Sequence, residues 1–276
     1  MRVTMSDVAA EAGVNKATVS RVLRGDPRIS SATGERVWST IKALGYRPDA
    51  IARGLSSRSS DTIGVFFRDL SAPWAGEFLA GFERVVSRHG SECMIRATGA
   101  DPQQRRNAMF RFLSRRVDGF VWLDGLPEPD AEVPGITVGI PSPSGVSVLV
   151  DIEVAASLLQ GLAGDRDIEI VQGERPFFPG IHSFLPVVKK KESGTVRVYD
   201  GNLPPDTETE HGDILVICTT RKCPVLSPDS WRLYWPAFEL GTLSARVLLN
   251  TIRGRGARPE TVRLLPVLSG PSRDQL

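Results

Sequence analysis

Apolar positions recur at helical spacing in the first sixty residues and predict three short helices. The first begins at a pair that resembles a capping box, Thr4 and Asp7, and ends at Gly13, where glycine tolerates a left-handed turn. A turn of a few residues leads to a second helix capped by Asn15, and a third is predicted from Ser31 to Leu44. Two short helices joined by a tight turn, with a third beneath them, form a helix-turn-helix arrangement.

The second helix, at residues 15–24, separates apolar from polar side chains. Its inner face carries Val19, Val22 and Leu23, and its outer face is polar and basic, with Lys16, Thr18, Ser20, Arg21 and Arg24. Such a helix can be held rigidly by its inner face and can present hydrogen-bond donors to the major groove of DNA. A three-helix bundle without a nucleic-acid role would show the same amphipathic pattern.

From residue 62 onward, short apolar runs alternate with amphipathic helical segments. Helices are predicted over 73–88, 102–115, 152–162 and 180–190, and strands at TIGVFF, CMIRAT, GFVWL, GITVGI, VSVLV, IEIVQG, TVRVYD and DILVICT. Strands separated by helices of this length indicate parallel βαβ units, so we expect an α/β body with two doubly wound lobes. Ligands of such sheets bind beyond the carboxyl ends of the strands, here in a cleft between the lobes.

Charge is distributed unevenly along the 276 residues. Residues 1–60 contain ten Lys/Arg and five Asp/Glu and carry +5, whereas residues 61–276 contain 24 and 27 and carry −3, in agreement with the total of +2. A basic head on a mildly acidic body indicates that the head, and not the body, meets a polyanion.

Several classes of protein are excluded by what the sequence lacks. It has no secretory signal and no apolar run long enough to cross a bilayer, and three cysteines argue against a disulfide framework, so a cytoplasmic protein is expected. Cys218, Cys223 and His211 do not have the spacing of a common zinc site, and neither a phosphate loop nor a nucleophile–His pattern is present. We therefore expect no metal, no cofactor and no enzymatic activity.

The head resembles a known family. The stretch MSDVAAEAGVNKATVSRVLRGDPRISSATGERVWSTIKALGYRPDAIARGL is similar to the head of the LacI/GalR (lac-repressor) family of bacterial transcription regulators, with DVAxxAGV, KATVSRVL and LGYxPxxxAxxL in register. The resemblance implies a helix-turn-helix DNA-binding domain at 1–46, a hinge helix and linker at 47–60, and an effector-binding and dimerisation domain at 61–276.

The resemblance also implies roles for individual residues of the head. Lys16 and Ala17 match the positions that choose the operator sequence, and Arg21 matches a base-contacting position. Leu55 matches the position that wedges into the minor groove and kinks the duplex. Positions at or near phosphate contacts are occupied by Thr18, Ser20, Arg24, Ser30 and Thr33.

The body resembles, more loosely, the periplasmic-binding-protein-like sensor domain of the same family. The resemblance implies a first lobe at about 61–150 and 236–262 and a second at about 151–235 and 263–276. Phe177 stands where the family usually has an effector-gripping Arg. After DILVICTT, the segment RKCPVLSPDS leads almost directly to WRLYWP, so about one helix and one strand are missing and the second lobe is abbreviated.

Five residues near strand ends remain candidates for binding a sugar-like effector: Asp69, Trp74, Asp124, Asp151 and Trp235. Carboxylates can accept hydrogen bonds from hydroxyl groups, and aromatic rings can stack on sugar rings. The alternative is that the aspartates cap helices and the tryptophans belong to the core.

The sequence therefore predicts a cytoplasmic, nucleoid-associated regulator of transcription. We expect a homodimeric repressor that binds a pseudo-palindromic operator in double-stranded DNA and is modulated by a small sugar-like effector. Two alternatives stay open: a DNA-binding regulator that is blind to effectors, and a ligand-binding receptor module with a vestigial DNA-binding head.

Overall fold

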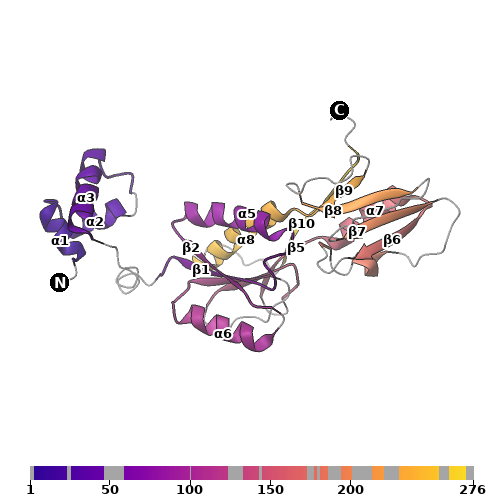
Figure 1. Ribbon diagram of the computed structural model, residues 1–276, viewed down its shortest axis with the longest axis horizontal. Helices are drawn as coiled ribbons and strands as arrows, with labels where there is room; N and C mark the ends of the chain where they lie inside the picture. The colour runs from indigo at the N-terminus through magenta and orange to yellow at the C-terminus, as the bar shows by residue number, and fades with distance from the viewer. Residues whose placement is uncertain are drawn as a thin grey trace. The chain divides into compact units, whose positions relative to one another are not determined.

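The computed structural model of the chain forms two compact units, Met1–Ser60 and Asp61–Leu276 (Figure 1). It describes residues 3–23, 26–46, 59–99, 101–123, 133–142, 145–172, 177–178, 181–185, 194–200, 213–220, 230–254 and 261–271. No helix within these ranges is long and apolar enough to span a membrane.

The first unit contains three α-helices: α1 (Met5–Glu11), α2 (Lys16–Leu23) and α3 (Ser31–Leu44). They pack around one small apolar core, whose buried members are Val8, Ala9, Ala12, Val19, Val22, Val37, Ile41 and Tyr46. All three predicted helices are confirmed, and α3 has the predicted limits.

Local hydrogen bonds explain where these helices begin and end. The Thr4 hydroxyl accepts a bond from the Asp7 backbone N–H (3.3 Å), and the Asp7 carboxylate accepts one from the Thr4 backbone N–H (2.7 Å), which completes the capping box. The Asn15 side chain accepts from the Thr18 backbone N–H at 2.7 Å and so caps α2. Gly45 ends α3 with φ of 62°, a left-handed conformation that suits glycine.

The second unit contains two sheets, and the first has six parallel strands in the order β10-β5-β4-β3-β1-β2. Helices α5 (Ala75–Arg88) and α8 (Ala237–Ile252) lie on one face and α6 (Pro102–Leu113) on the other (Figure 1). The strands are β1 (Thr62–Phe67), β2 (Glu92–Ala97), β3 (Gly119–Leu123), β4 (Gly135–Val138), β5 (Val146–Val150) and β10 (Thr261–Leu264).

The second sheet has five strands in the order β11-β9-β8-β7-β6, and only β11 runs antiparallel to its neighbour. It packs against α7 (Ile152–Ala163), which also contacts the short 3-10 helix η1 (Ile181–Phe184). Its strands are β6 (Asp167–Gln172), β7 (Thr195–Asp200), β8 (Ile214–Thr219), β9 (Trp231–Tyr234) and β11 (Val267–Ser269). The predicted two-lobed α/β architecture is therefore confirmed.

Several elements differ from the sequence-based expectation. The helix predicted over 180–190 is described only as the single turn η1, and most of the remainder lies outside the described residues. The segment WRLYWP contains strand β9, and neither β9 nor β10 was among the predicted strands. The predicted shortening after DILVICTT falls on residues 221–229, which also lie outside the described residues.

The chain passes between the two sheets three times: from β5 to α7, from β9 to α8, and from β10 to β11. The last crossing comes after Leu264, two residues beyond the expected boundary at residue 262. The segment from α7 to β9 is therefore inserted within the first lobe, and β11 returns the chain to the second sheet after β10. One continuous apolar core contains residues of both lobes, among them Val121 and Val198.

Helices α5 and α8 approach each other closely through a pair of glycines. A Cβ atom at Gly81 would lie 2.0 Å from the Phe238 carbonyl oxygen, and one at Gly241 would lie 2.0 Å from the Phe78 carbonyl oxygen. Real side chains do not tolerate such distances, so both positions require glycine for the backbones to meet.

Candidate nucleic-acid interface

The packing of α2 determines which of its side chains face solvent. Val19 and Val22 are buried in the core of the first unit, so the face that they occupy cannot contact a ligand. Lys16, Ala17 and Arg21 are exposed on the outer face. Rigid anchoring with exposed basic side chains is the arrangement required of a helix that reads a DNA groove.

Thr18 and Ser20 are half-buried at the sides of α2, so neither is as accessible as the three outer residues. The Thr18 hydroxyl donates to the Asn15 side chain at 2.9 Å, which ties it to the helix cap. Side chains at the edge of a recognition helix are suited to contacts with the sugar-phosphate backbone rather than with base edges.

Ser30 and Thr33 lie together at the start of α3. The Thr33 backbone N–H donates to the Ser30 Oγ at 3.3 Å, and the two hydroxyl groups are joined by a 2.9 Å hydrogen bond. A helix start presents backbone N–H groups that bind anions, so this pair is placed where a phosphate contact is chemically favourable.

Arg28 differs from Lys16 and Arg21 because it forms an ion pair within the head. Arg28 donates two hydrogen bonds to the Asp26 carboxylate, at 2.9 and 2.6 Å, and these bonds hold the pKa of Asp26 far below its usual range. Within the described residues, Lys16 and Arg21 form no hydrogen-bonded ion pair through their side chains. Their donors are therefore available to a polyanion. Arg24 and Leu55, which the sequence also implicates, lie outside the described residues.

The predicted effector-binding aspartates take part in local structure. The Asp69 carboxylate follows β1 and accepts bonds from the Ser71 backbone N–H (2.8 Å) and hydroxyl (2.6 Å). Asp151 follows β5 and caps α7 by accepting from the Val154 backbone N–H at 3.1 Å. Asp124 lies outside the described residues.

The two candidate tryptophans belong to the apolar core of the second unit. Trp74 is 7% exposed and meets Phe78 edge-on at a centroid distance of 6.3 Å. Trp235 is 5% exposed and meets Phe178 edge-on at 5.1 Å. In this conformation neither ring offers a free face for sugar stacking, and an effector role for these five residues stays a prediction.

The sequence reasoning did not identify the environment of Asp200, at the carboxyl end of β7. This buried carboxylate accepts hydrogen bonds from the backbone N–H groups of Phe177 (2.6 Å) and Phe178 (3.0 Å). Burial raises the pKa of the neighbouring Cys218 thiol well above its usual value, and the charge of Asp200 raises it further. The available signal was an aspartate that ends the apolar run TVRVYD.

A hydrogen bond also joins the two lobes, between the end of a strand and the start of a helix. Thr220, which follows β8, donates its hydroxyl to the carboxylate of Glu77 in the first turn of α5. This contact links the carboxyl end of β8 in the second sheet to the first lobe.

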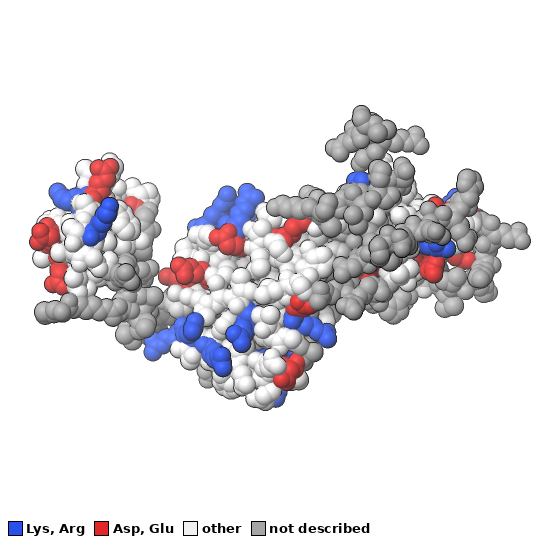
Figure 2. All heavy atoms as spheres, viewed as in Figure 1, with Lys and Arg blue, Asp and Glu red and all other residues white. Residues whose placement is uncertain are grey.

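Lys and Arg side chains on the visible face of the second unit form separate groups with Asp and Glu between them (Figure 2). The described part of the body therefore offers no continuous basic surface on that face, in contrast to the basic outer side of α2.

No described group of His, Cys, Asp and Glu side chains could hold a metal ion.

Comparisons of sequence agree with this location of the interface. The family model described as bacterial regulatory proteins, lacI family, matches residues 4–49. The catabolite control protein A of Priestia megaterium is 34% identical over 185 residues, which cover 63% of this chain and 56% of that protein. The chain thus spans about half the length of the curated relatives that it matches.

Comparisons of structure extend the similarity to the body. A crystal structure of the lac repressor dimer bound to operator and the anti-inducer ONPF has a TM-score of 0.71 at 18% identity, and the match covers 97% of this chain and 98% of that chain. A transcriptional regulator in complex with cellobiose has a TM-score of 0.56 at 21% identity, with 97% and 98% covered. At these identities the likeness establishes a shared fold.

Proposed function

We propose that this chain is a member of the LacI/GalR family of bacterial regulators and a sequence-specific DNA-binding regulator of transcription that acts as a repressor. The observation that carries the proposal is α2, a capped helix with a buried inner face and with Lys16, Ala17 and Arg21 exposed on its outer face. Its relatives are regulators of transcription, and we propose no enzymatic activity for this chain.

The exposed residues of α2 differ in what they can recognise. Arg21 can donate two hydrogen bonds to the O6 and N7 atoms of guanine, and Lys16 can reach the same atoms as a single charge. Ala17 lacks a hydrogen-bonding group and can contribute only an apolar contact, for example with a thymine methyl. Thr18, Ser20, Ser30 and Thr33, together with Arg24, position the head through phosphate contacts, and Leu55 enters the minor groove.

A single head of this size reads only a few base pairs, and for this reason we propose that the chain acts as a homodimer on a pseudo-palindromic operator. The centres of the two half-sites should be separated by about ten base pairs or a multiple of that distance. We propose that residues 1–46 bind DNA, that residues 47–60 form a hinge and linker, and that residues 61–276 dimerise and sense the effector.

Selection of bound sequences from random double-stranded DNA, repeated across salt concentrations with the purified full chain, tests the proposal. An inverted-repeat consensus with an affinity that falls steeply with salt is expected. Weak binding without an enriched motif would instead favour a receptor module with a vestigial head.

Regulation by a sugar-like effector in the cleft is the first candidate for the role of the body, with Asp69, Trp74, Asp124, Asp151 and Trp235 as the proposed contacts. The cellobiose-bound regulator is a structural neighbour that supports this candidate. A second candidate, an effector-blind regulator, is favoured by the burial of Phe177, Phe178 and Trp235 in the apolar core.

Calorimetric titration of the full chain with a panel of sugars and nucleosides distinguishes the two candidates. Saturable heat that disappears in an Asp69→Ala variant would support the effector-regulated reading. The absence of binding heat for every ligand of the panel, with operator binding intact, would support the hypothesis of an effector-blind regulator.

A further inference from the structure

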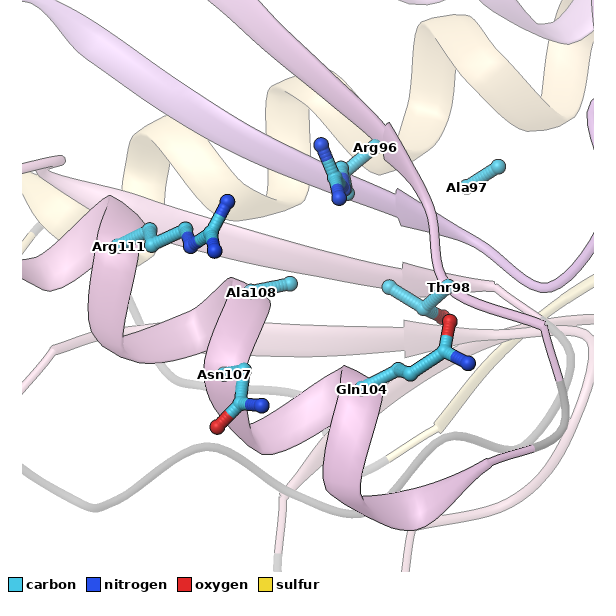
Figure 3. A pocket seen from close by; sticks show the side chains of 7 residues that line it. All are labelled: Arg96, Ala97, Thr98, Gln104, Asn107, Ala108 and Arg111. Carbon is cyan, nitrogen blue, oxygen red and sulfur yellow. The ribbon is translucent and has the colours of Figure 1, made fainter.

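A hollow of about 250 Å³ lies between strand β2 and helix α6, away from the residues discussed so far. Figure 3 shows Arg96 on the strand and Arg111 on the helix, with the side chain of Arg111 extending along the hollow toward Arg96. The other lining residues are Ala97, Thr98, Gln104, Asn107 and Ala108.

The two arginines give this hollow an uncompensated positive charge. Neither guanidinium forms a hydrogen bond or an ion pair with another described residue, and none of the lining residues is acidic. Both side chains are exposed. Two cations that line one hollow repel each other, and an anion bound between them would remove that cost.

The walls of the hollow are fixed by regular structure. Arg96 lies in β2 opposite Phe66 of β1, and Thr98 donates both its backbone N–H (2.9 Å) and its hydroxyl (3.3 Å) to the Phe67 carbonyl oxygen. The small side chain of Ala108 leaves room between Arg96 and Arg111 (Figure 3). The space therefore results from the packing of a strand and a helix rather than from a surface loop.

Neutral donors complete the lining. The Asn107 side-chain oxygen accepts from the Gln103 side chain at 3.1 Å, and its amide N–H₂ group takes no part in that bond. Gln104 contributes a second amide at the opposite end of the hollow from Arg111 (Figure 3). Two forked guanidinium groups with neighbouring amides are the donor set that recognises phosphate oxygens.

We propose that the hollow between β2 and α6 binds the phosphate group of a small phosphorylated molecule. A phosphate monoester carries about two negative charges near neutral pH and has three acceptor oxygens, which match two guanidinium groups. The hollow is smaller than most pockets for drug-sized ligands, so it accommodates a compact ligand. It lies at the carboxyl end of β2, where ligands of parallel sheets bind.

The full-length protein is titrated with inorganic phosphate and with glycerol 3-phosphate by calorimetry in a phosphate-free chloride buffer. The variants Arg96→Gln and Arg111→Gln each remove one guanidinium, and Arg115→Gln is the matched control because Arg115 is exposed just beyond α6 and does not line the hollow. Saturable binding is expected in the parent protein, weakened about tenfold in each of the first two variants and unchanged in the control. Circular dichroism verifies that the exposed substitutions leave the fold intact.

Three outcomes would overturn the proposal. The first is an absence of binding by the parent protein at ligand concentrations up to about 10 mM. The second is an equal loss in all three variants, which would indicate general charge attraction. The third is tighter binding of succinate than of either phosphate, which would assign the hollow to carboxylates. None of these measurements involves DNA, so a failure of the proposed operator binding would be recognised separately.

Discussion

At the scale of the residue, polar side chains of this molecule fall into two groups. Arg28 is held by Asp26, and Asp200 is satisfied by two buried backbone N–H groups. Lys16 and Arg21 form no such side-chain hydrogen bonds with described residues, although the charge of Arg21 acts on Asp26. Residues of the first group stabilise local structure, and those of the second are available to ligands.

Replacing Lys16 by alanine should change which operator sequences are preferred more than it changes the dependence of affinity on salt. A base-contacting cation discriminates between base pairs by about 1–3 kcal/mol, whereas a phosphate-contacting cation mainly affects the salt slope. Sequence selection at two or more salt concentrations measures both quantities, and Lys42→Ala, an exposed substitution on α3, is the control. Uniformly weaker binding with an unchanged preference would identify Lys16 as a phosphate contact.

Cys93 should react slowly with iodoacetamide at pH 8. Burial, together with the charges of Glu83 and Glu92, raises the pKa of its thiol from 9.0 to about 11. Because the thiolate is the reactive form, the rate at pH 8 should be about a hundredfold lower than for a thiol with a pKa of 9, and it should increase up to about pH 11. Peptide mapping by mass spectrometry follows Cys93 individually, and the chain unfolded in denaturant is the reference. A rate at pH 8 equal to that of the unfolded chain would contradict the expectation.

At the scale of the element, the sequence predicted those helices and strands that are determined by nearby residues, and it missed those that depend on distant pairing. The limits of α3 were predicted because Ser30 and Gly45 cap it, and the runs TIGVFF, GFVWL, VSVLV and TVRVYD match β1, β3, β5 and β7 residue by residue. Strand β10 was missed because its four residues alternate in exposure and are defined by pairing with distant β5.

The same distinction applies to the candidate sites. The outer face of α2 could be predicted because its residues share one helix. The hollow between Arg96 and Arg111 could not, because these residues lie on different elements and meet only when α6 packs on β2. Burial of Trp74 and Trp235 likewise depends on tertiary contacts with Phe78 and Phe178.

The close approach of α5 and α8 predicts opposite effects for two similar substitutions in α5. Gly81→Ala places a methyl group 2.0 Å from the Phe238 carbonyl oxygen, so the helices must separate, and the free energy of unfolding should fall by about 1–3 kcal/mol or more. Gly76→Ala meets no atom within 4 Å and should raise it by up to about 1 kcal/mol. Urea-induced unfolding measures both. Similar effects of the two substitutions would show that the helices do not meet at Gly81.

At the scale of the whole molecule, the chain forms two compact units. The second unit contains two sheets that share one apolar core. The proposed function assigns DNA reading to the first unit and pairing of two copies to the second. Affinity for an operator would then depend on both half-sites being read at once.

Scrambling one half of the selected operator should therefore lower the affinity of the full chain by at least about a hundredfold. Each mismatched base pair costs about 1–3 kcal/mol, and several positions are lost together. Fluorescence anisotropy with matched duplexes measures the change, and scrambling the flanking sequence outside both half-sites is the control. A loss no larger than that of the flanking control would mean that one head binds alone.

The insertion of the second lobe into the first has a consequence for how the chain is made. Strand β10 pairs with β5, with Thr261 opposite Ser147, so the first sheet lacks its outer strand until most of the second lobe, from α7 to β9, has been synthesised. At about 5–20 residues per second, β5 waits about 6–23 seconds on the ribosome for its partner. During that interval its edge is open to pairing with other chains, which makes the nascent protein a substrate for chaperones until translation is nearly complete.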